Sequence, residues 1–430
     1  MNAKLRDAFL GSLKSLDRRF KVVLAAVGAF NWANNLPLNY SQIYAVALGA
    51  SPMELSSLNS VGGVVSALIS APAGWLIDRH GVKKMFTIGL ALSAVVSAIY
   101  GCASSWLVLI PAVILTQISF KFIMPLADLI FVGTSRPETR AQAMGLSRMI
   151  WAMSSLVAPM MAAFIVTYYG GINVQGIRPL YFIQLLSITL VIAFVILRLE
   201  ELRARLASDD YDRGASDKGF IEGFRDLLRG ERWLKEWVIL MGLWRFATSI
   251  SMPFIMLWMV YAKGADPYVL GAVSTVGFLT SIILQVPVGV MADRIGRKKA
   301  FLLIRPLTYI GTILLVIAPN PQLLVPVGAL GALGLMGGIS DVSFIPFITM
   351  FWEVVPAEKR GRWFGLTGIF DILTVPAFML GGFLWQAGLE VLVLLLPLFV
   401  EVFTIIPILI VVPDTLGLSN DTVATSTYTA

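Results

Sequence analysis

The segment from Gly49 to Phe86 recurs from Gly264 to Phe301, which gives the chain an internal repeat at an offset of 215 residues, half of its 430-residue length. Of the 38 aligned positions, 15 are identical. Prolines and glycines are prominent among them, as in Pro52 and Pro267, Gly62 and Gly277, and Pro72 and Pro287. A repeat of this length, whose copies each hold several apolar runs, is typical of a duplicated membrane domain.

Hydrophobic residues make up 57% of the chain and charged residues only 14%, which is far from the balance of a soluble globular domain. Apolar runs of about 20 residues or more can cross the hydrocarbon core as helices. Six of them lie near residues 20–45, 53–78, 84–104, 106–133, 142–168 and 179–199, and six more near 236–262, 267–292, 299–318, 321–351, 362–387 and 390–412. We therefore expect an all-helical integral membrane protein with twelve transmembrane helices in two pseudo-symmetric six-helix bundles.

The formal net charge of +7 could attract nucleic acid, but the basic residues gather on one side of the predicted membrane topology. The clusters lie near residues 4–21, 79–84, 136–140, 198–235, 294–299 and 359–362. The turns on the opposite side carry only Arg178 and Lys263. The positive-inside rule then places both termini in the cytoplasm. We expect a multi-pass protein of the cell (plasma) membrane, surrounded by lipid and without a nucleic-acid partner.

Residues 200–235 form the only long polar connection, and they separate the two copies of the repeat. The predicted domains are an N-terminal bundle over 1–199, a cytoplasmic linker over 200–235, a C-terminal bundle over 236–412 and a cytoplasmic tail over 413–430. Apolar residues at helical spacing between 5 and 20 predict a short amphipathic helix on the membrane surface before the first span. The linker is either a second interfacial helix or a flexible charged segment.

The chain has one cysteine, Cys102, and one histidine, His80, so neither a disulfide framework nor a histidine metal site is expected. The sequence shows no set of a nucleophile and a base, so we expect neither an enzyme nor a cofactor. A proton carrier in this chain would have to be a carboxylate.

A glycine-rich basic motif occupies the turn between spans 2 and 3, and a second copy lies between spans 8 and 9. The copies read Gly74-Trp-Leu-Ile-Asp78-Arg79-His-Gly81-Val-Lys83-Lys84 and Gly289-Val-Met-Ala-Asp293-Arg294-Ile-Gly296-Arg297-Lys298-Lys299. Here the chain resembles the major facilitator superfamily, whose signature is Gly-x-Leu-x-Asp-Arg-x-Gly-Arg-Lys-x. The resemblance covers the whole chain and implies a secondary active transporter that works by alternating access.

The chemistry of this motif is that of a gate. Gly81 and Gly296 permit tight turns, and carboxylates at Asp78 and Asp293 can bond to the positive N-terminus of another helix. The family implies such a latch, with Asp78 facing helix 11 and Asp293 facing helix 5 when the cytoplasmic side is closed. The alternative is that both copies only satisfy a turn and set the topology.

Span 5 resembles a second signature, that of the drug–proton antiporters, in spacing more than in residues. Gly145, Ser154, Ala158-Pro159 and Ala162-Ala163 occupy positions where the antiporters have mostly glycine. Small residues there allow close helix packing, and Pro159 bends the span. The antiporter interpretation and generic packing both remain open.

Ionisable residues inside apolar spans are costly and are therefore candidates for function. Lys121 lies near the middle of span 4 and Asp341 near the middle of span 10. The repeat places them at nearly equivalent positions, so we expect them to bind substrate, exchange a proton or pair with each other. Asp371 in span 11 and Asp128 in span 4 are further proton-coupling candidates, and we rank Asp341 and Asp371 above Asp128.

Polar residues form stripes on spans 1 and 7, where lipid would penalise them. The predicted substrate-binding residues are Asn31, Trp32, Asn34, Asn35, Asn39, Tyr40, Gln117, Lys121, Arg148, Trp244, Arg245, Thr248 and Asp341. Amides and aromatic rings suit a polar or aromatic ligand, although interhelical bonding between amides is the alternative. The family places spans 9 and 12 outside the bundle, so we interpret Arg305 and Glu401 as a structural pair or as snorkelling groups.

The sequence thus predicts a transporter of a small organic solute, and we favour proton-coupled antiport directed outward. The alternative is an uptake symporter or facilitator of an organic anion or other polar metabolite, and the anion is motivated by Lys121, Arg148 and Arg245. A non-transporting sensor or scaffold with the same fold is a third possibility. We expect a monomer, because one chain holds both halves of the pathway.

Overall fold

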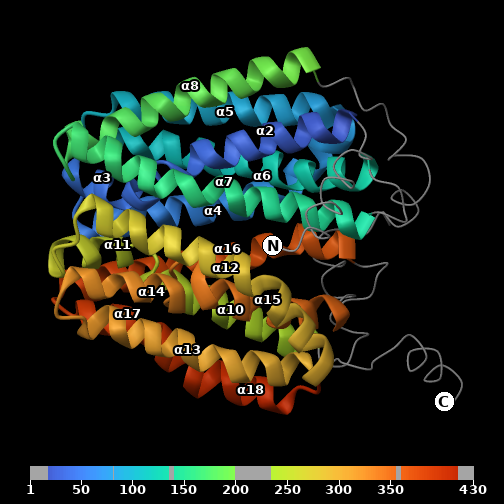
Figure 1. The fold of residues 1–430 in the computed structure, drawn as a ribbon, viewed down its shortest axis with the longest axis vertical. Coiled ribbons are helices and arrows are strands. Elements are labelled where there is room, and N and C mark those ends of the chain that lie inside the picture. Colours follow the sequence, from blue (N-terminus) through green and yellow to red (C-terminus); the bar gives the residue numbers. More distant parts are fainter. Residues whose placement is uncertain (1–17, 81, 135–139, 199–233, 355–359, 415–430) are drawn as a thin grey trace, which may run out of the picture. The chain divides into compact units, whose positions relative to one another are not determined.

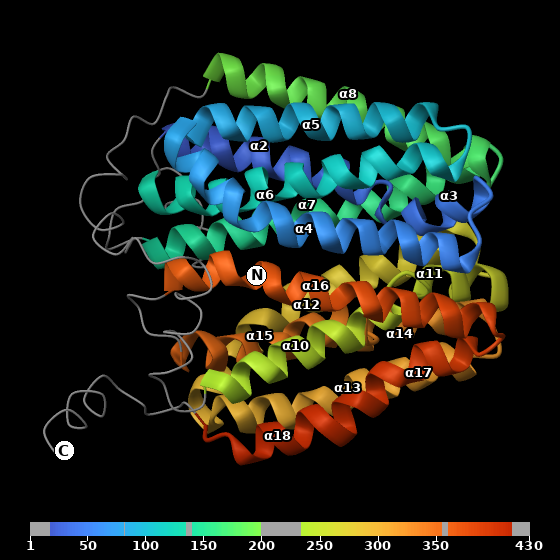
Figure 2. The same cartoon turned by 180° about the vertical axis from the view of Figure 1, so that it is seen from behind.

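The computed structural model describes residues 18–80, 82–134, 140–198, 234–354 and 360–414, with the side chains of 124–152, 360–367 and a few other residues excepted. The chain divides into two compact units, Met1–Ala215 and Ser216–Ala430. In both, the described residues form helices joined by short connections and no strand (Figures 1 and 2). An all-helical fold is therefore confirmed for the described chain.

Unit 1 contains six long helices and three short ones among its described residues. In chain order they are α2 (Arg18–Asn35), η1 (Leu38–Tyr40), α3 (Ser41–Ala47), α4 (Pro52–His80), α5 (Val82–Cys102), η2 (Trp106–Val108), α6 (Leu109–Thr134), α7 (Arg140–Tyr168) and α8 (Val174–Arg198). Helix α5 packs against α6 and α8, and α2 packs against α7 and α8 (Figure 1). A core that includes Phe30, Phe86 and Ile123 joins α2, α4, α5, α6 and α8.

Unit 2 repeats this arrangement with more interruptions. Its elements are α10 (Leu234–Ser251), α11 (Ile255–Leu257), the π-helical turn η4 (Trp258–Ala262), α12 (Pro267–Ile295), α13 (Arg297–Ile317), η5 (Pro321–Leu324), α14 (Val325–Leu330), α15 (Gly338–Val354), α16 (Arg360–Gln386), α17 (Glu390–Val400), the π-helical turn η7 (Glu401–Ile405) and α18 (Ile406–Val411). Helix α10 packs against α16 and α17, and α13 packs against α15 (Figure 2). Trp237, Phe347 and Phe351 lie in its main core.

Helices α4 and α12 begin at equivalent residues of the repeat, and both beginnings are capped. Asp266 accepts a hydrogen bond from the backbone N–H of Val269 at 2.8 Å. Ser51 and Glu54 form a reciprocal capping box, in which the Glu54 carboxylate accepts from the Ser51 N–H at 2.7 Å. The proline that follows each cap has no N–H to satisfy, so it suits the first turn.

Seven helical segments of the described chain are long and apolar enough to cross a membrane. They are Lys83–Cys102, Trp106–Ile123, Val174–Arg198, Leu234–Ala262, Pro267–Ile295, Arg297–Ile317 and Glu390–Val411. Met153–Tyr168, Pro321–Leu330, Gly338–Phe351 and Phe370–Gln386 are shorter apolar helices. The protein is thus a multi-pass membrane protein, and the number twelve stays a prediction.

Spans 1 and 7, predicted near 20–45 and 236–262, both contain a break in the regular helix. Helix α2 ends at Asn35 and helix α10 at Ser251, which is an offset of 216 and close to the offset of 215 in the repeat. Pro37 and Pro253 each lie two residues after these ends. A proline lacks the N–H of a helical turn and clashes with the carbonyl four residues earlier. The prolines therefore explain why the regular helix of each of these spans is interrupted.

Candidate functional site: an interrupted span in the second unit

Span 10 is the fourth span of unit 2, and it differs from its counterpart in unit 1 by an insertion. The offset between equivalent residues is 215 from Trp106 to Pro321 but 220 from Thr134 to Val354, so unit 2 has five more residues in this stretch. Helix α6 runs without a break through the unit 1 stretch, whereas in unit 2 the helix stops at Leu330 and resumes at Gly338. The prediction of one continuous span over 321–351 was therefore wrong. We call residues 331–337 the interruption.

Glycine allows the interruption to lie inside the helical bundle. Gly337 has φ +94° and Gly331 has φ +72°, values that residues with a side chain rarely adopt. A Cβ on Gly337 would come within 3.2 Å of the Gly277 Cα on α12, and a Cβ on Gly311 of α13 would collide with the Gly331 carbonyl. The backbone of the interruption thus packs directly against two neighbouring helices.

Side chains from three other helices replace some of the hydrogen bonds that the interrupted helix lacks. Thr312 on α13 accepts from the Leu333 N–H at 3.0 Å, and Ser251 on α10 donates to the Leu333 carbonyl at 3.1 Å. Ser281 on α12 donates to the Gly338 carbonyl at 3.2 Å. In lipid, irregular backbone is tolerated only where protein or a water-filled cavity satisfies it. The interruption meets this condition through its neighbours.

Asp341 lies in the first turn of α15, directly after the interruption. Its carboxylate accepts a hydrogen bond from the Gly337 N–H at 2.9 Å, and so caps the beginning of the helix. The residue is exposed, and among the described residues no basic side chain lies within ion-pair distance of it. Asp341 is thus a carboxylate that forms no ion pair among the described residues and lies at the interruption of span 10.

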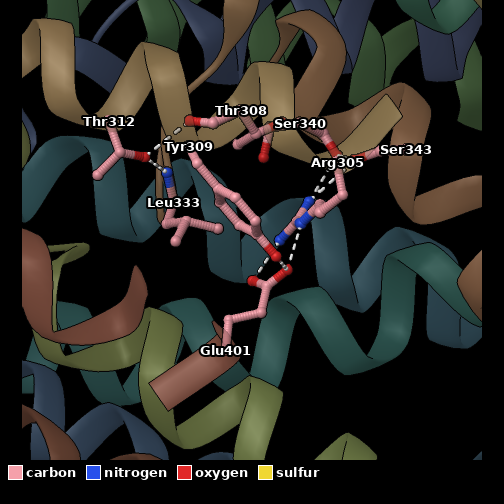
Figure 3. A network of polar contacts seen from close by, with 8 residues as sticks. All are labelled: Arg305, Thr308, Tyr309, Thr312, Leu333, Ser340, Ser343 and Glu401. Atoms are coloured by element: carbon pink, nitrogen blue, oxygen red, sulfur yellow. Dashed lines mark hydrogen bonds and ion pairs between the residues drawn. The ribbon is translucent and has the colours of Figure 1, made fainter. Parts of the chain in front are cut away.

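Arg305 on α13 connects α15 to span 12 (Figure 3). Its guanidinium donates to both carboxylate oxygens of Glu401, at 2.5 and 2.8 Å, and to the Ser343 hydroxyl at 2.9 Å. Tyr309 donates to the same carboxylate at 2.9 Å. The side chains of Arg305 and Glu401 are only 3% and 2% exposed. The structural pair expected from the sequence is therefore confirmed, and snorkelling is excluded.

Arg245 and Asp371, predicted as a substrate residue and a proton carrier, lie together. Arg245 Nη2 is 2.6 Å from Asp371 Oδ1. Next to this pair, the Trp244 ring stacks on Phe344 of α15 with 4.5 Å between centroids. Thr248 is half-buried one turn further along α10 and donates to the Trp244 carbonyl. Because Phe344 follows Asp341 by three residues, the aromatic pair and that carboxylate lie on one side of α15.

The amide stripe of span 1 is joined to spans 5 and 6. Asn31 and Asn35 are buried and donate to Ser155 on α7 at 2.7 and 3.2 Å. Asn34 accepts from Gln184 on α8 at 2.9 Å. These bonds hold helices together, as the alternative interpretation expected. Substrate binding by the stripe stays a prediction.

The other predicted residues of unit 1 are placed as follows. Asn39 and Tyr40 are buried, whereas Trp32 and Lys121 are half-buried. Gln117 is half-buried on α6, and its amide lies 2.9 Å from where a Cβ of Gly62 on α4 would be. The side chains of Asp128 and Arg148 lie outside the described residues.

The second copy of the basic motif forms a network within unit 2. Arg297 lies 2.8 Å from Glu353 at the end of α15 and 3.5 Å from Asp293. Lys298 donates to the last carbonyls of α18, at Ile410 and Val412. The motif thus ties the beginning of α13 to the ends of spans 10 and 12.

The remaining members of the two motifs differ in their surroundings. Gly296 has φ +103° at the turn that precedes Arg297, and a Cβ on Gly289 would have open space around it. Arg294, Arg79 and Lys84 are exposed, and Lys83 is half-buried. Gly81 and the surroundings of Gly74 and Asp78 lie outside the described residues, as do the linker over 200–233 and the tail from 415.

The sequence contained a signal for the contacts of α13 that the prediction did not use. Arg305, Thr308 and Thr312 recur at helical spacing and are buried, whereas Leu303 and Ile310 between them are exposed. Such a polar stripe in an apolar span predicts polar partners on neighbouring helices. The partners Ser343 and Leu333 could not be identified, because the interruption itself was not predicted.

The described residues contain no group of three or more histidine, cysteine, aspartate or glutamate side chains that could hold a metal ion.

Comparison with known sequences identifies relatives of the chain. The family model described as Major Facilitator Superfamily matches residues 22–371 and 237–424. Multidrug resistance protein 2 of Bacillus subtilis (strain 168) is 23% identical over 242 residues, which are 55% of this chain and 57% of that protein. The aligned part thus spans little more than half the length of this curated relative.

Solved structures share the fold over nearly the whole chain. The human organic anion transporter MFSD10 (TETRAN) has a TM-score of 0.58 and 15% identity, covering 91% of this chain and 99% of its own. The nucleoside transporter NupG has a TM-score of 0.67 and 11% identity, covering 90% and 98%. FucP in the outward conformation has a TM-score of 0.61 and 14% identity, covering 91% and 97%.

Proposed function

The chain belongs to the Major Facilitator Superfamily, and from that premise we propose that it exports a small organic solute in exchange for protons. It is a multi-pass membrane transporter of small solutes rather than an enzyme. Proton coupling, outward direction, alternating access, residence in the cell (plasma) membrane with both termini cytoplasmic, and a monomeric state are parts of the proposal.

The observation that carries the proposal is the placement of Asp341. A carboxylate that lies at a break in a membrane span and forms no ion pair among the described residues can change its proton without dismantling a buried ion pair. Its cap on the Gly337 N–H connects the state of the carboxylate to the backbone of the interruption. Protonation weakens this charge-assisted bond. A proton on Asp341 therefore favours a different arrangement of span 10 from the one that the carboxylate favours.

Asp371 is a weaker candidate because its carboxylate already forms an ion pair with Arg245, 2.6 Å away. The same pair bears on the substrate. Arg245 and Asp371 are together neutral, which weakens the case that Arg245 selects an organic anion. Trp244 and Phe344 offer a stacked aromatic surface beside them. We propose that this surface contacts the apolar or aromatic part of the solute.

Outward direction is supported by the name of the curated relative, a multidrug resistance protein. Uptake or facilitated diffusion of an organic anion remains the competing function, because Lys121 is half-buried on α6 and one structural relative is an organic anion transporter. The functions differ in a way that can be measured: in antiport the solute moves against the imposed flow of protons, in proton-coupled uptake it moves with that flow, and in facilitated diffusion its flux ignores the pH gradient.

The test is solute flux in proteoliposomes under an imposed pH gradient, with a screen of aromatic, cationic and anionic solutes. Asp341→Asn keeps an oxygen that can cap the helix but removes the titrating group. Asp266→Asn is the matched control, since Asp266 also caps a helix with its side chain. We expect gradient-driven flux in the wild type and in Asp266→Asn, and its loss in Asp341→Asn. Flux that ignores both the gradient and the Asp341 change contradicts the proposal.

A further inference from the structure

We propose that Arg305 is a positioning residue for span 10: it holds the beginning of α15, and with it Asp341, while Glu401 supplies the counter-charge that makes a buried guanidinium tolerable. The inference rests on the proposed role of Asp341 in transport. It concerns Arg305 on span 9 and Glu401 on span 12, which are not among the predicted substrate-binding residues.

The Arg305 guanidinium lies between Glu401 and the peptide group that precedes Asp341. One side donates to both oxygens of Glu401, and Nη1 on the other side reaches the Ser340 carbonyl at 3.4 Å and the Ser343 hydroxyl at 2.9 Å (Figure 3). Ser343 itself donates to the Ser340 carbonyl at 2.9 Å. Ser340 is the residue directly before Asp341, so two donors converge on the peptide group that leads into Asp341.

Helix α13 also holds the backbone that precedes that peptide group. Thr312, two turns along α13 from Arg305, accepts from the Leu333 N–H within the interruption. One face of α13 therefore holds the chain both inside the interruption and just after it (Figure 3). Arg305, Thr312 and Ser343 are all buried. Because one helix bonds to the chain at Leu333 and again at Ser340, the interruption keeps a defined geometry despite its glycines.

Burying the ion pair of Arg305 and Glu401 costs desolvation energy. Two charges buried in a bundle cost desolvation energy that their attraction barely repays, and well-packed apolar residues usually hold two helices at least as well. Packing of spans 9 and 12 alone does not explain why Arg305 and Glu401 are charged. An apolar pair could not donate to the Ser340 carbonyl, whereas the guanidinium can.

Span 12 contains a π-helical turn at Glu401–Ile405. A π turn adds one residue to the helical turn and changes the direction of the side chains beside it, and such turns are frequent at functional sites. Here the turn begins at Glu401, whose carboxylate accepts hydrogen bonds from both Arg305 and Tyr309. Span 12 thus departs from regular helix at the residue that pairs with Arg305.

A charge swap separates positioning from simple pairing. Arg305→Glu with Glu401→Arg keeps two opposite charges between spans 9 and 12 but moves the donors away from Ser340 and Ser343. Arg305→Met with Glu401→Leu removes both charges and keeps similar volume. Ser343→Ala removes one donor to the Ser340 carbonyl and leaves the ion pair intact. Thr349→Ala is its matched control, because the Thr349 hydroxyl also lies on α15 but bonds only to the Ile345 carbonyl of its own helix in the described chain.

The first readout does not depend on transport. It is the rate at which a hydrophobic carbodiimide labels Asp341 at one fixed pH, measured by mass spectrometry on protein shown to be folded by its thermal transition. The second readout is gradient-driven flux. We expect a several-fold change in labelling and a several-fold loss of flux in both double variants, a smaller change of the same sign in Ser343→Ala, and no change in Thr349→Ala.

Wild-type labelling and flux in a folded double variant would overturn the inference, because a structural pair would then be sufficient. If neither double variant folds, Ser343→Ala decides: labelling equal to that of Thr349→Ala overturns the inference, and labelling clearly different supports it. If the wild type shows no gradient-driven flux, the proposed function fails, while the labelling of Asp341 still tests the positioning role.

Discussion

Arg245 on α10 and Asp371 on α16 form an ion pair with 2.6 Å between Nη2 and Oδ1, and its two members differ in exposure. The Arg245 side chain is 48% exposed, whereas that of Asp371 is 8% exposed. The carboxylate is therefore the more desolvated of the two partners. The guanidinium can return to water without it.

This asymmetry predicts unequal effects of removing either partner. Arg245→Ala leaves a buried carboxylate short of a donor, which costs about 1–3 kcal/mol of stability, whereas Asp371→Asn leaves an arginine that is already half in solvent. We expect the larger drop in thermal transition temperature for Arg245→Ala, measured in detergent by intrinsic fluorescence. Equal drops, or a larger drop for Asp371→Asn, would contradict the assignment of Asp371 as the more desolvated partner.

The glycines of the interruption yield a second prediction. Gly337→Ala places a Cβ on a residue with φ +94° and presses it against the Gly277 backbone. Gly388→Ala is the matched control, because Gly388 has φ +77° but open space around a Cβ. The backbone strain alone costs about 1–2 kcal/mol. We expect Gly337→Ala to lose clearly more stability than Gly388→Ala. Similar losses would show that the backbone of the interruption can move away from Gly277 at little cost.

The amides of span 1 allow structure to be separated from binding. Ser155→Ala removes the hydroxyl that accepts from Asn31 and Asn35, while Asn35 keeps its bonds to the Asn31 carbonyl and side-chain oxygen, so we expect a loss of about 0.5–1.5 kcal/mol, that of one intramolecular hydrogen bond. Thr167→Ala on the same helix is the control, since that hydroxyl bonds to the Ala163 carbonyl one turn away. We expect lower thermal stability and an unchanged KM for transport. A raised KM at unchanged stability would instead place the amides in contact with the solute.

The network of the second motif predicts an effect on rate rather than on affinity. Arg297 pairs with Glu353 and lies near Asp293. We propose that this group controls a step of the conformational cycle, so Glu353→Gln should lower the maximal rate several-fold and leave solute binding to the solubilised protein unchanged. Glu236→Gln, another acidic residue near a helix end of unit 2, is the comparison. Weaker binding with an unchanged rate would contradict a gating role.

Much of the fold can be predicted from the sequence, because a chain that crosses lipid must satisfy its backbone hydrogen bonds internally and so forms helices or closed barrels. The offset of 215 residues, the apolar runs and the repeated Asp–Arg motif predict two equivalent helical halves, and the caps at Ser51 and Asp266 begin equivalent helices. The interruption of span 10 was not predicted. Apolar residues on both sides of residues 331–337 hide it, and its hydrogen bonds come from Thr312, Ser251 and Ser281, which are distant in sequence.

The candidate site was predicted as a set of residues but not as a set of contacts. Asp341, Asp371 and Arg245 were all identified as polar residues in apolar spans. Sequence spacing could not show that Arg245 and Asp371 pair, because 126 positions of the chain separate the two residues. That pairing is what leaves Asp341 as the foremost candidate for the proton.

The measurement that tests this assignment most directly compares two assays on one preparation of Asp341→Asn in proteoliposomes. Exchange of labelled for unlabelled solute needs no net proton movement, whereas uphill accumulation under a pH gradient does. Asparagine keeps the cap on Gly337 and resembles a carboxylate that is always protonated. We predict that Asp341→Asn retains exchange and loses uphill accumulation, while Asp371→Asn retains a measurable part of both. Uphill accumulation by Asp341→Asn at the wild-type level would contradict the account.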